Sequence, residues 1–305
     1  MTHTLSGIFN ILATPFLPDQ QLDLTSLTHL VNCQLEWGAN GLTILGVLGE
    51  SAKLTIEERH RVMEAVLHTV NGRVSVVVGA SHPDPSVSVE LAQAALRLGA
   101  IGVMIAPPAS LPNPNDDALY AYYHHLAEQI NGEIVVQDFP ALNGIHLSTT
   151  VLSRIAHDLP TCRHLKLEAP PLMQKVSAIL AHPSPMRIFG GLGGMFLLEE
   201  LQRGTVGTMT GFAFTEVLVA VYEAWERGDA ERASALFDRF LPLIRYENQA
   251  EINLPLRKEL LRRRGAIASA TLRPPYTPLD APTDAEIKRV LARVGIQDPT
   301  QRLLL

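Results

Sequence analysis

Short apolar runs alternate with longer amphipathic segments over most of the chain. Most of the runs are continuously apolar rather than alternating, which is typical of parallel strands covered on both faces. Breaks of Gly, Pro, Ser and Asp separate the runs from the amphipathic segments. We predict strands at residues 7–12, 41–45, 74–78, 102–106, 133–137, 164–167, 187–190 and 207–210.

The segments between the predicted strands carry the signals of helix ends. Gly38 and Gly99 follow amphipathic stretches, where a left-handed C-cap is wanted. Four residues that can cap a helix N-terminus precede such stretches: Asp23, Thr55, Asp84 and Ser148. Because the strands begin every 20 to 35 residues, we predict an α/β fold, a (β/α)8 TIM barrel. An open doubly wound sheet would need a Gly-x-Gly-x-x-Gly turn, and residues 13–16 read Ala-Thr-Pro-Phe.

After the eighth unit the pattern changes to helix only. Helical stretches cover residues 230–243, 252–264 and 284–294, and a Pro-rich segment at 272–282 joins the last two. This connector is too short for a flexible linker. We therefore predict a catalytic barrel at residues 1–228 and a C-terminal helical extension at residues 229–305 that packs on it.

Composition narrows the classes of partner. The net charge is −6, and the basic residues form no block longer than residues 262–264, which argues against nucleic-acid binding. Cys33 and Cys162 supply neither a disulfide framework nor a metal knuckle, so we expect buried thiols and no metal. No 18-residue apolar run and no signal-peptide pattern appears, so we expect a soluble, cytoplasmic protein without a membrane partner.

Candidate chemistry lies where strands end, because barrels of this kind carry their active sites there. The predicted sixth strand holds Lys166 between two leucines, and Glu168 follows two positions later on the same face. Burial is costly for a charged lysine and favours the neutral amine, which attacks carbonyl carbons. A purely structural ion pair between Lys166 and Glu168 is the alternative interpretation.

Three other strand ends carry candidate residues. The two glycines of residues 46–51 could present backbone N–H groups to a carboxylate, or form a plain turn. Gln137 and Asp138 end the fifth strand, where Asp138 suits catalysis and loop bracing equally well. The glycine-rich residues 190–194 suit either a phosphate group or the backbone of a substrate.

Taken together, these motifs resemble the dihydrodipicolinate synthase/N-acetylneuraminate lyase family of Schiff-base barrels. The family's Gly-x-x-Gly-Glu loop matches Gly46 to Glu50, and its Schiff-base lysine matches Lys166. The resemblance covers the whole chain and implies a lyase for a small 2-keto acid, without a cofactor, assembled as a dimer or tetramer. Besides catalytic Lys166 and Glu168, it implies substrate contacts at Val47, Leu48, Gln137, Gly191 and Met209.

Departures from the family pattern narrow this expectation. Dihydrodipicolinate synthase has two threonines where this chain has Val47 and Leu48, and a tyrosine where it has Gln137. A substrate-binding arginine is absent from residues 140–144. These changes argue against the condensation of lysine biosynthesis and against sialic-acid cleavage. The Lys-x-Glu-x-Pro-Pro segment from Lys166 to Pro171 more closely resembles the branch of 2-keto-3-deoxy-L-arabonate dehydratase.

The resemblance therefore implies dehydration of a 2-keto-3-deoxy sugar acid. Lys166 would condense with the C2 ketone, Glu168 would take a C3 proton, and the C4 hydroxyl would leave as water. Three alternatives remain open at this point. The chain could be a pyruvate-releasing class I aldolase, a ligand-sensing barrel without turnover, or a phosphate-dependent barrel that uses residues 190–194.

Overall fold

Eight parallel strands close into one barrel in the computed structural model, which describes residues 5–305. Each strand pairs with the next, and the last pairs with the first. The predicted (β/α)8 barrel is confirmed, and seven strands begin at the predicted residue while β3 begins one residue later. Residues 1–4, which fall within the barrel predicted at residues 1–228, lie outside the described residues. The strands are β1 Gly7–Ile11, β2 Gly41–Ile44, β3 Ser75–Gly79, β4 Gly102–Ile105, β5 Glu133–Asp138, β6 His164–Leu167, β7 Arg187–Gly190 and β8 Gly207–Thr210.

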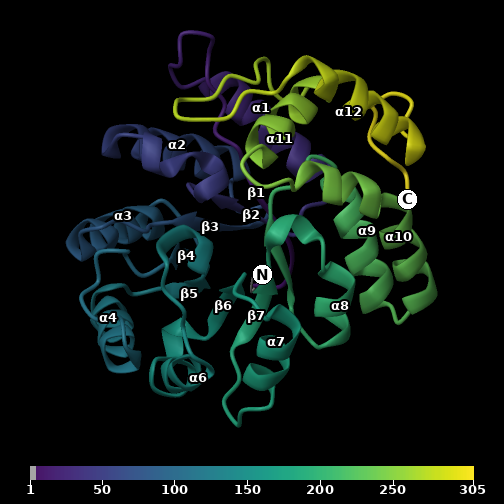
Figure 1. The fold of residues 1–305 in the computed structure, drawn as a ribbon. Helices are drawn as coiled ribbons and strands as arrows, with labels where there is room; N and C mark the ends of the chain where they lie inside the picture. Colours follow the sequence, from purple (N-terminus) through teal and green to yellow (C-terminus); the bar gives the residue numbers. More distant parts are fainter. Residues whose placement is uncertain (1–4) are drawn as a thin grey trace.

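Helices surround the strands, as Figure 1 shows. Each of the four predicted N-caps accepts a hydrogen bond from a backbone N–H in the first turn, and Thr55 forms a capping box with Glu58. Gly38 and Gly99 both have positive φ, as the predicted C-caps require. The helices are α1 Leu24–Glu36, α2 Ile56–Val70, α3 Pro85–Arg97, α4 Asp116–Gln129, α5 Pro140–Asn143, α6 Thr149–Asp158, α7 Leu172–Leu180, α8 Leu197–Gln202, α9 Thr215–Glu226, α10 Ala230–Glu247, α11 Asn253–Arg263 and α12 Ala281–Arg293. None of those in the described part of the chain is both long and apolar enough to cross a bilayer.

An apolar cluster fills the lower part of the barrel. Its fully or almost fully buried members come from alternate positions of six strands and the segment before β1: Leu5, Phe9, Val77, Met104, Val135, Phe189 and Met209. Val135 and Phe189 lie two residues before Gln137 and Gly191, so these residues share a face of their strands. The cluster therefore fills the barrel below the C-terminal strand ends, and Lys166 and Gln137 lie above it.

Two of the three C-terminal helices extend beyond the predicted limits, and α11 ends one residue short of them on each side. Helix α10 continues to Glu247 rather than ending at residue 243, although Pro242 lies inside it. Burial of its apolar face stabilises the helical turn that follows the proline. Helix α12 begins at Ala281, three residues before the predicted start, because Asp280 caps it through Thr283 N–H. The boundary that we predict between residues 228 and 229 falls between α9 and α10 and stays a prediction.

Buried ion pairs join the C-terminal helices to the barrel. In α11, Lys258 Nζ lies 2.6 Å from Glu50 in the loop after β2. Just after α11, Arg264 pairs with Glu216 of α9 at 2.6 Å. Removing one partner from a fully buried pair typically costs about 3–5 kcal/mol, because the other charge stays uncompensated. These pairs therefore hold the helical extension against the loop that follows β2 and against α9. Helix α11 lies near α1 in Figure 1, and Ala268 N–H just after it donates to Ser26 Oγ of α1.

Candidate active site

Lys166 and Glu168 meet inside the barrel at the end of β6. Their Nζ and Oε2 atoms are 2.8 Å apart, and the two side chains are only 6% and 7% exposed. The alternation of side chains along the strand directs both to the interior, as the sequence predicts. The leucines on either side of Lys166 predict apolar surroundings for its amine. In the structure a carboxylate faces the amine instead. At this distance a proton can pass directly between them.

Besides Lys166, two other chain segments contact the Glu168 carboxylate. Gln137 Nε2 of β5 donates to Oε2 at 3.3 Å, and Leu192 N–H donates to Oε1 at 3.4 Å. In the strand register Gln137 lies directly beside Lys166. The structure therefore brings Lys166, Glu168, Gln137 and the Gly191 region into one cluster.

Gly191 leaves the space that Glu168 occupies. A Cβ atom built on Gly191 would lie 2.6 Å from the Cγ and Oε1 of Glu168. Gly191 lies at φ −153° and ψ −129°, outside the extended region, and Glu168 fills the space that a side chain at this position would need. Glu200 lies similarly close to the Cα of Gly190. The Glu168 carboxylate beside the glycine-rich turn argues against its use as a phosphate site.

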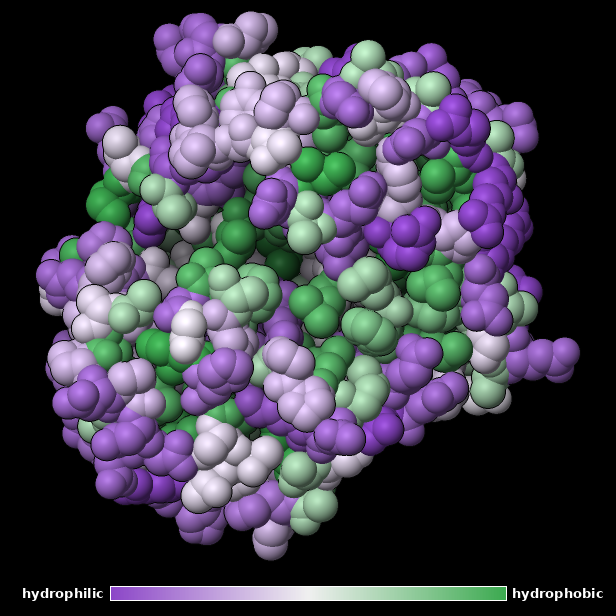
Figure 2. Space-filling model, viewed as in Figure 1, coloured by the Kyte–Doolittle hydropathy of each residue, from purple (hydrophilic) through white to green (hydrophobic). Residues whose placement is uncertain are grey.

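A cavity of about 620 Å³ opens beside this cluster. Figure 2 shows a hollow near the centre of the viewed face, with hydrophobic side chains gathered around it. Gln137 lines the cavity and joins it to the Lys166–Glu168 pair. Its wall is formed by residues from the loops after β2 and β3, the end of β5, and helices α2, α5 and α11, among them Val47, Leu48, Ser51, Arg59, Ser81, His82, Leu142, Asn253 and Leu254.

Val47 and Leu48 begin a short 3₁₀ turn, Val47–Gly49, on the cavity wall. The N–H groups of Gly49 and Glu50 are used inside this turn. By contrast, those of Val47 and Leu48 make no hydrogen bond with any residue from 5 to 305. Two backbone donors thus remain available for a carboxylate group in the cavity.

Two candidate residues have structural positions instead. Met209 is fully buried in the apolar cluster below the site and does not line the cavity, so the structure gives it packing contacts where we predict a substrate contact. Asp138 points away from the cluster and pairs with Lys175 Nζ at 2.5 Å. It also accepts a hydrogen bond from Leu147 N–H at 3.4 Å. Burial raises the pKa of Asp138 although Lys175 opposes the rise, and these contacts support the loop-bracing interpretation.

The cavity also contains residues that the sequence analysis did not single out. Arg59 lies on the buried face of α2, and its Nη1 has no hydrogen-bond partner among the described residues. An arginine at the buried positions of an amphipathic helix is a signal that could have identified it. Asn253 and Leu254 come from α11, and no local pattern relates them to a strand end more than 100 residues earlier.

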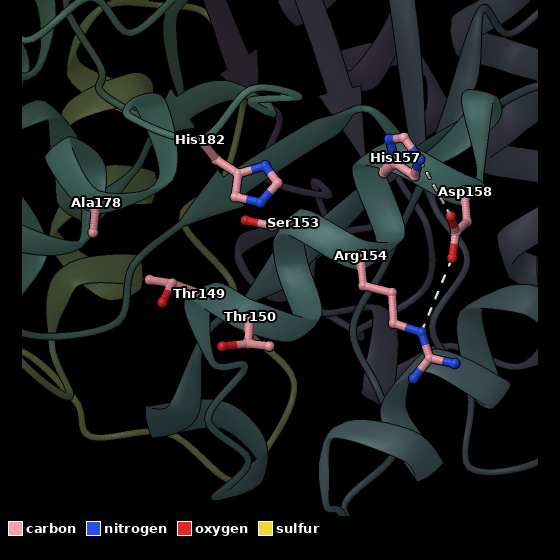
Figure 3. A pocket seen from close by; sticks show the side chains of 8 residues that line it. All are labelled: Thr149, Thr150, Ser153, Arg154, His157, Asp158, Ala178 and His182. Atoms are coloured by element: carbon pink, nitrogen blue, oxygen red, sulfur yellow. Dashed lines mark ion pairs between the residues drawn. The ribbon is translucent and has the colours of Figure 1, made fainter.

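A second hollow lies on the outer layer, between α6 and α7 (Figure 3). Arg154 points toward Asp158 there, at 4.0 Å, and also pairs with Asp117 at 2.8 Å. This second hollow contains none of the predicted site residues. In the described chain, no group of three or more His, Cys, Asp or Glu side chains is placed to hold a metal ion. The cavity beside Lys166 is therefore the candidate active site.

Comparison with known proteins gives matches along nearly the whole chain. A model described as the dihydrodipicolinate synthetase family matches residues 4–294. The chain is 32% identical over 296 residues to L-2-keto-3-deoxyarabonate dehydratase of Azospirillum brasilense, with 94% of each chain covered. It is 28% identical over 301 residues to 4-hydroxy-tetrahydrodipicolinate synthase of Methanopyrus kandleri, with 97% and 98% covered. A crystal structure of dihydrodipicolinate synthase from Rhodopseudomonas palustris has a TM-score of 0.89 at 34% identity and covers 94% of this chain and 97% of its own.

Gly191→Ala tests the close approach of Glu168. The added methyl group must displace the carboxylate, so we expect a loss of about 1–3 kcal/mol in the free energy of unfolding. In a Glu168→Ala background the same substitution should cost less, because the clashing atoms are gone. Urea denaturation of the four proteins of this cycle measures the coupling. An equal cost in both backgrounds would show that Gly191 does not make room for Glu168.

Proposed function

Because the chain belongs to the dihydrodipicolinate synthetase family, we propose that it is a Schiff-base lyase that removes water from a 2-keto-3-deoxy sugar acid of the pentonate type. The observation that carries this proposal is the buried contact of 2.8 Å between Lys166 Nζ and Glu168 Oε2, with Gln137 beside it. The nucleophile and the proton-transfer group are then in direct contact, and Gln137 stands beside Lys166 where the family has its tyrosine.

The reaction begins at the substrate's C2 ketone. The neutral amine of Lys166 attacks C2, and loss of water gives an iminium ion. Glu168 takes a proton from C3, and the electrons of the C–H bond flow toward the iminium nitrogen to form an enamine. The enamine expels the C4 hydroxyl, to which Glu168 returns its proton, so that water leaves. Tautomerisation and hydrolysis release a 2-oxoglutarate semialdehyde and free Lys166.

Glu168 is the residue suited to carry both proton transfers. A carboxyl group can take and return a proton, whereas the amide of Gln137 donates or accepts hydrogen bonds without changing its protonation. Gln137 Nε2 and Leu192 N–H each donate to a different oxygen of Glu168, which orients the carboxylate toward Lys166. This arrangement supports a site in which Glu168 replaces the family's tyrosine.

The cavity supports a small sugar acid as the substrate. The free N–H groups of Val47 and Leu48 suit the carboxylate at C1, next to the ketone that must reach Lys166. Polar side chains farther along the wall, among them Ser51 and Asn253, suit the hydroxyl groups of the sugar. The relative named L-2-keto-3-deoxyarabonate dehydratase is consistent with this class of substrate.

A pyruvate-releasing aldolase is the second candidate. It would use the same iminium but break the C3–C4 bond, which requires a base for the C4 hydroxyl. The chain is also 28% identical to 4-hydroxy-tetrahydrodipicolinate synthase, whose name indicates a synthase rather than a dehydratase. This second relative is the reason to test the aldolase beside the dehydratase. A sensing barrel without turnover is the third. The dimer or tetramer expected from the resemblance stays a prediction.

Sodium borohydride with pyruvate should attach a single adduct to Lys166. The other four lysines are Lys53, Lys175, Lys258 and Lys288. Lys258 is the strongest competitor, because burial lowers its pKa to about 8 although Glu50 opposes the shift. Intact mass and peptide mapping identify the site, with Lys166→Met as the variant that should lose the adduct and Lys288→Met as its matched control. An adduct on Lys258 or Lys175 in the wild type would overturn the assignment.

Glu168→Gln should still form the adduct but lose turnover by about 10²–10⁴-fold, which is typical of a lost general acid/base. The substitution keeps the size and hydrogen-bonding capacity of the side chain and removes only its ability to transfer protons. Single-turnover trapping and steady-state kinetics separate the two effects. Unchanged turnover would make Glu168 a structural partner of Lys166.

The choice of substrate separates the candidate functions. A 2-keto-3-deoxy-pentonate should yield the semialdehyde, detected by coupling to an aldehyde dehydrogenase, because elimination needs only Lys166 and Glu168. Condensation of pyruvate with aspartate semialdehyde should be negligible, since Val47, Leu48 and Gln137 lack the hydroxyl groups of the synthase. Pyruvate and glycolaldehyde as main products would favour the aldolase. Adduct formation without turnover on any five- or six-carbon keto-deoxy acid would favour the sensing barrel.

A further inference from the structure

Glu200 is a buried carboxyl group that the proposed reaction leaves without a role. It lies in α8 and is 1% exposed, and neither carboxyl oxygen has a hydrogen-bond partner among residues 5–305. A Cβ atom built on Gly190 would lie 1.8 Å from its Oε2, so only glycine allows the carboxyl to approach β7. Native proteins leave few buried polar atoms unpaired, and such an atom calls for an explanation.

Glu200 and Glu168 lie on opposite sides of the same stretch of backbone. Glu200 occupies the space where a side chain of residue 190 would lie, and Glu168 occupies the space where a side chain of residue 191 would lie. Side chains of successive residues in an extended strand point to opposite faces, so Glu168 is inside the barrel and Glu200 is between β7 and α8. Only the thickness of one strand separates two carboxyl groups that are both shielded from water.

No cation compensates Glu200 from the elements that pack on α8. Strand β8 has no ionisable side chain, and Glu199 of α8 itself is exposed. The other charged groups on this side are engaged elsewhere: Lys175 with Asp138, Arg203 with Met173 O and Ser177 Oγ, Glu216 with Arg264, and Glu247 with Arg257. Glu168 is thus the buried charge that acts on Glu200 most strongly.

These surroundings favour the neutral acid. Burial first, and then repulsion from Glu168 and Glu199, raise the pKa of Glu200 to about 8. The N–H of Gly191 offsets part of this rise, although it does not reach hydrogen-bonding geometry. The repulsion is mutual, so a negative charge on Glu200 would also act across the strand on Glu168 and on its partner Lys166.

We propose that Glu200 is a positioning residue that acts through Glu168: as a neutral acid behind β7, it allows Glu168 to be ionised and Lys166 to release its proton. The proposal rests on the Schiff-base function proposed above. When Glu200 ionises, its negative charge makes the ammonium form of Lys166 harder to deprotonate. The fraction of nucleophilic amine then rises less with pH than it would beside a neutral group.

The first test measures stability and needs no substrate. A neutral Glu200 binds a proton in the folded protein that the unfolded chain releases above its ordinary pKa of 4.5. Folding is therefore progressively disfavoured as the pH rises from about 4.5 to 8, and the penalty is constant above that range. Glu200→Gln does not titrate, so its Tm relative to the wild type should increase across this window and then level off. The matched control, Glu90→Gln on the exposed face of α3, should show no such trend.

The second test measures borohydride trapping of pyruvate at Lys166 between pH 6 and 9.5. The rates of Glu200→Gln and wild type should converge at the acidic end, and the variant should be about 3- to 10-fold faster above pH 8.5, as expected for a shift of one-half to one pH unit. Glu90→Gln should follow the wild-type profile. Glu200→Met, which is also uncharged, provides the same comparison if the glutamine variant does not fold.

The outcomes separate the two proposals. A pH-dependent gain in both tests supports the role of Glu200. A constant rate ratio at every pH, or a Tm difference that does not change with pH, would overturn it, because a merely structural side chain gives this result. Absence of any adduct in the wild type would refute the Schiff-base function and with it the role in catalysis, while the Tm series would still report whether Glu200 is a buried neutral acid.

Discussion

The structure depends on keeping an amine and a carboxylate in contact inside a closed, mostly apolar barrel. Either Lys166 or Glu168 alone would be an uncompensated buried charge and would cost several kcal/mol. Together, at 2.8 Å, they neutralise each other, and Gln137 and Leu192 N–H satisfy the remaining oxygen positions. The apolar cluster around Phe9 and Met209 closes the barrel below and keeps water from reaching the pair from that side.

This arrangement sets the demands on the strands around it. The end of β7 must carry no side chains, because Gly190 and Gly191 lie against the carboxyl groups of Glu200 and Glu168. The end of β5 must supply a neutral hydrogen-bond donor beside Lys166, and Gln137 does so. A second ionisable group at the position of Gln137 would compete for the same proton, so its amide leaves proton transfer to Glu168.

The wall of the cavity is held from outside the barrel. Glu50, which ends the turn with the free N–H groups, has a left-handed backbone at φ 53°. Its buried carboxylate binds Lys258 of α11 and Lys53, and accepts from Arg273 N–H. Because α11 also places Asn253 and Leu254 on the same wall, the C-terminal helices shape the cavity as well as covering the barrel.

The amino-acid sequence by itself determined the barrel, seven of its eight strand starts, the four helix caps examined and the shared face of Lys166 and Glu168. These features depend on short-range periodicity and on hydrogen bonds within one turn, so neighbouring residues are sufficient to predict them. Only the tertiary structure decided that Met209 packs in the apolar cluster, that Asp138 braces a loop through Lys175, and which residues of α2 and α11 line the cavity. The tertiary structure alone also decided that Glu200 lies against Gly190 of β7, next to the glycine that Glu168 contacts. Such contacts join positions tens to hundreds of residues apart, and they follow from the stagger of the closed strands and the packing of the outer helices, which no local pattern encodes.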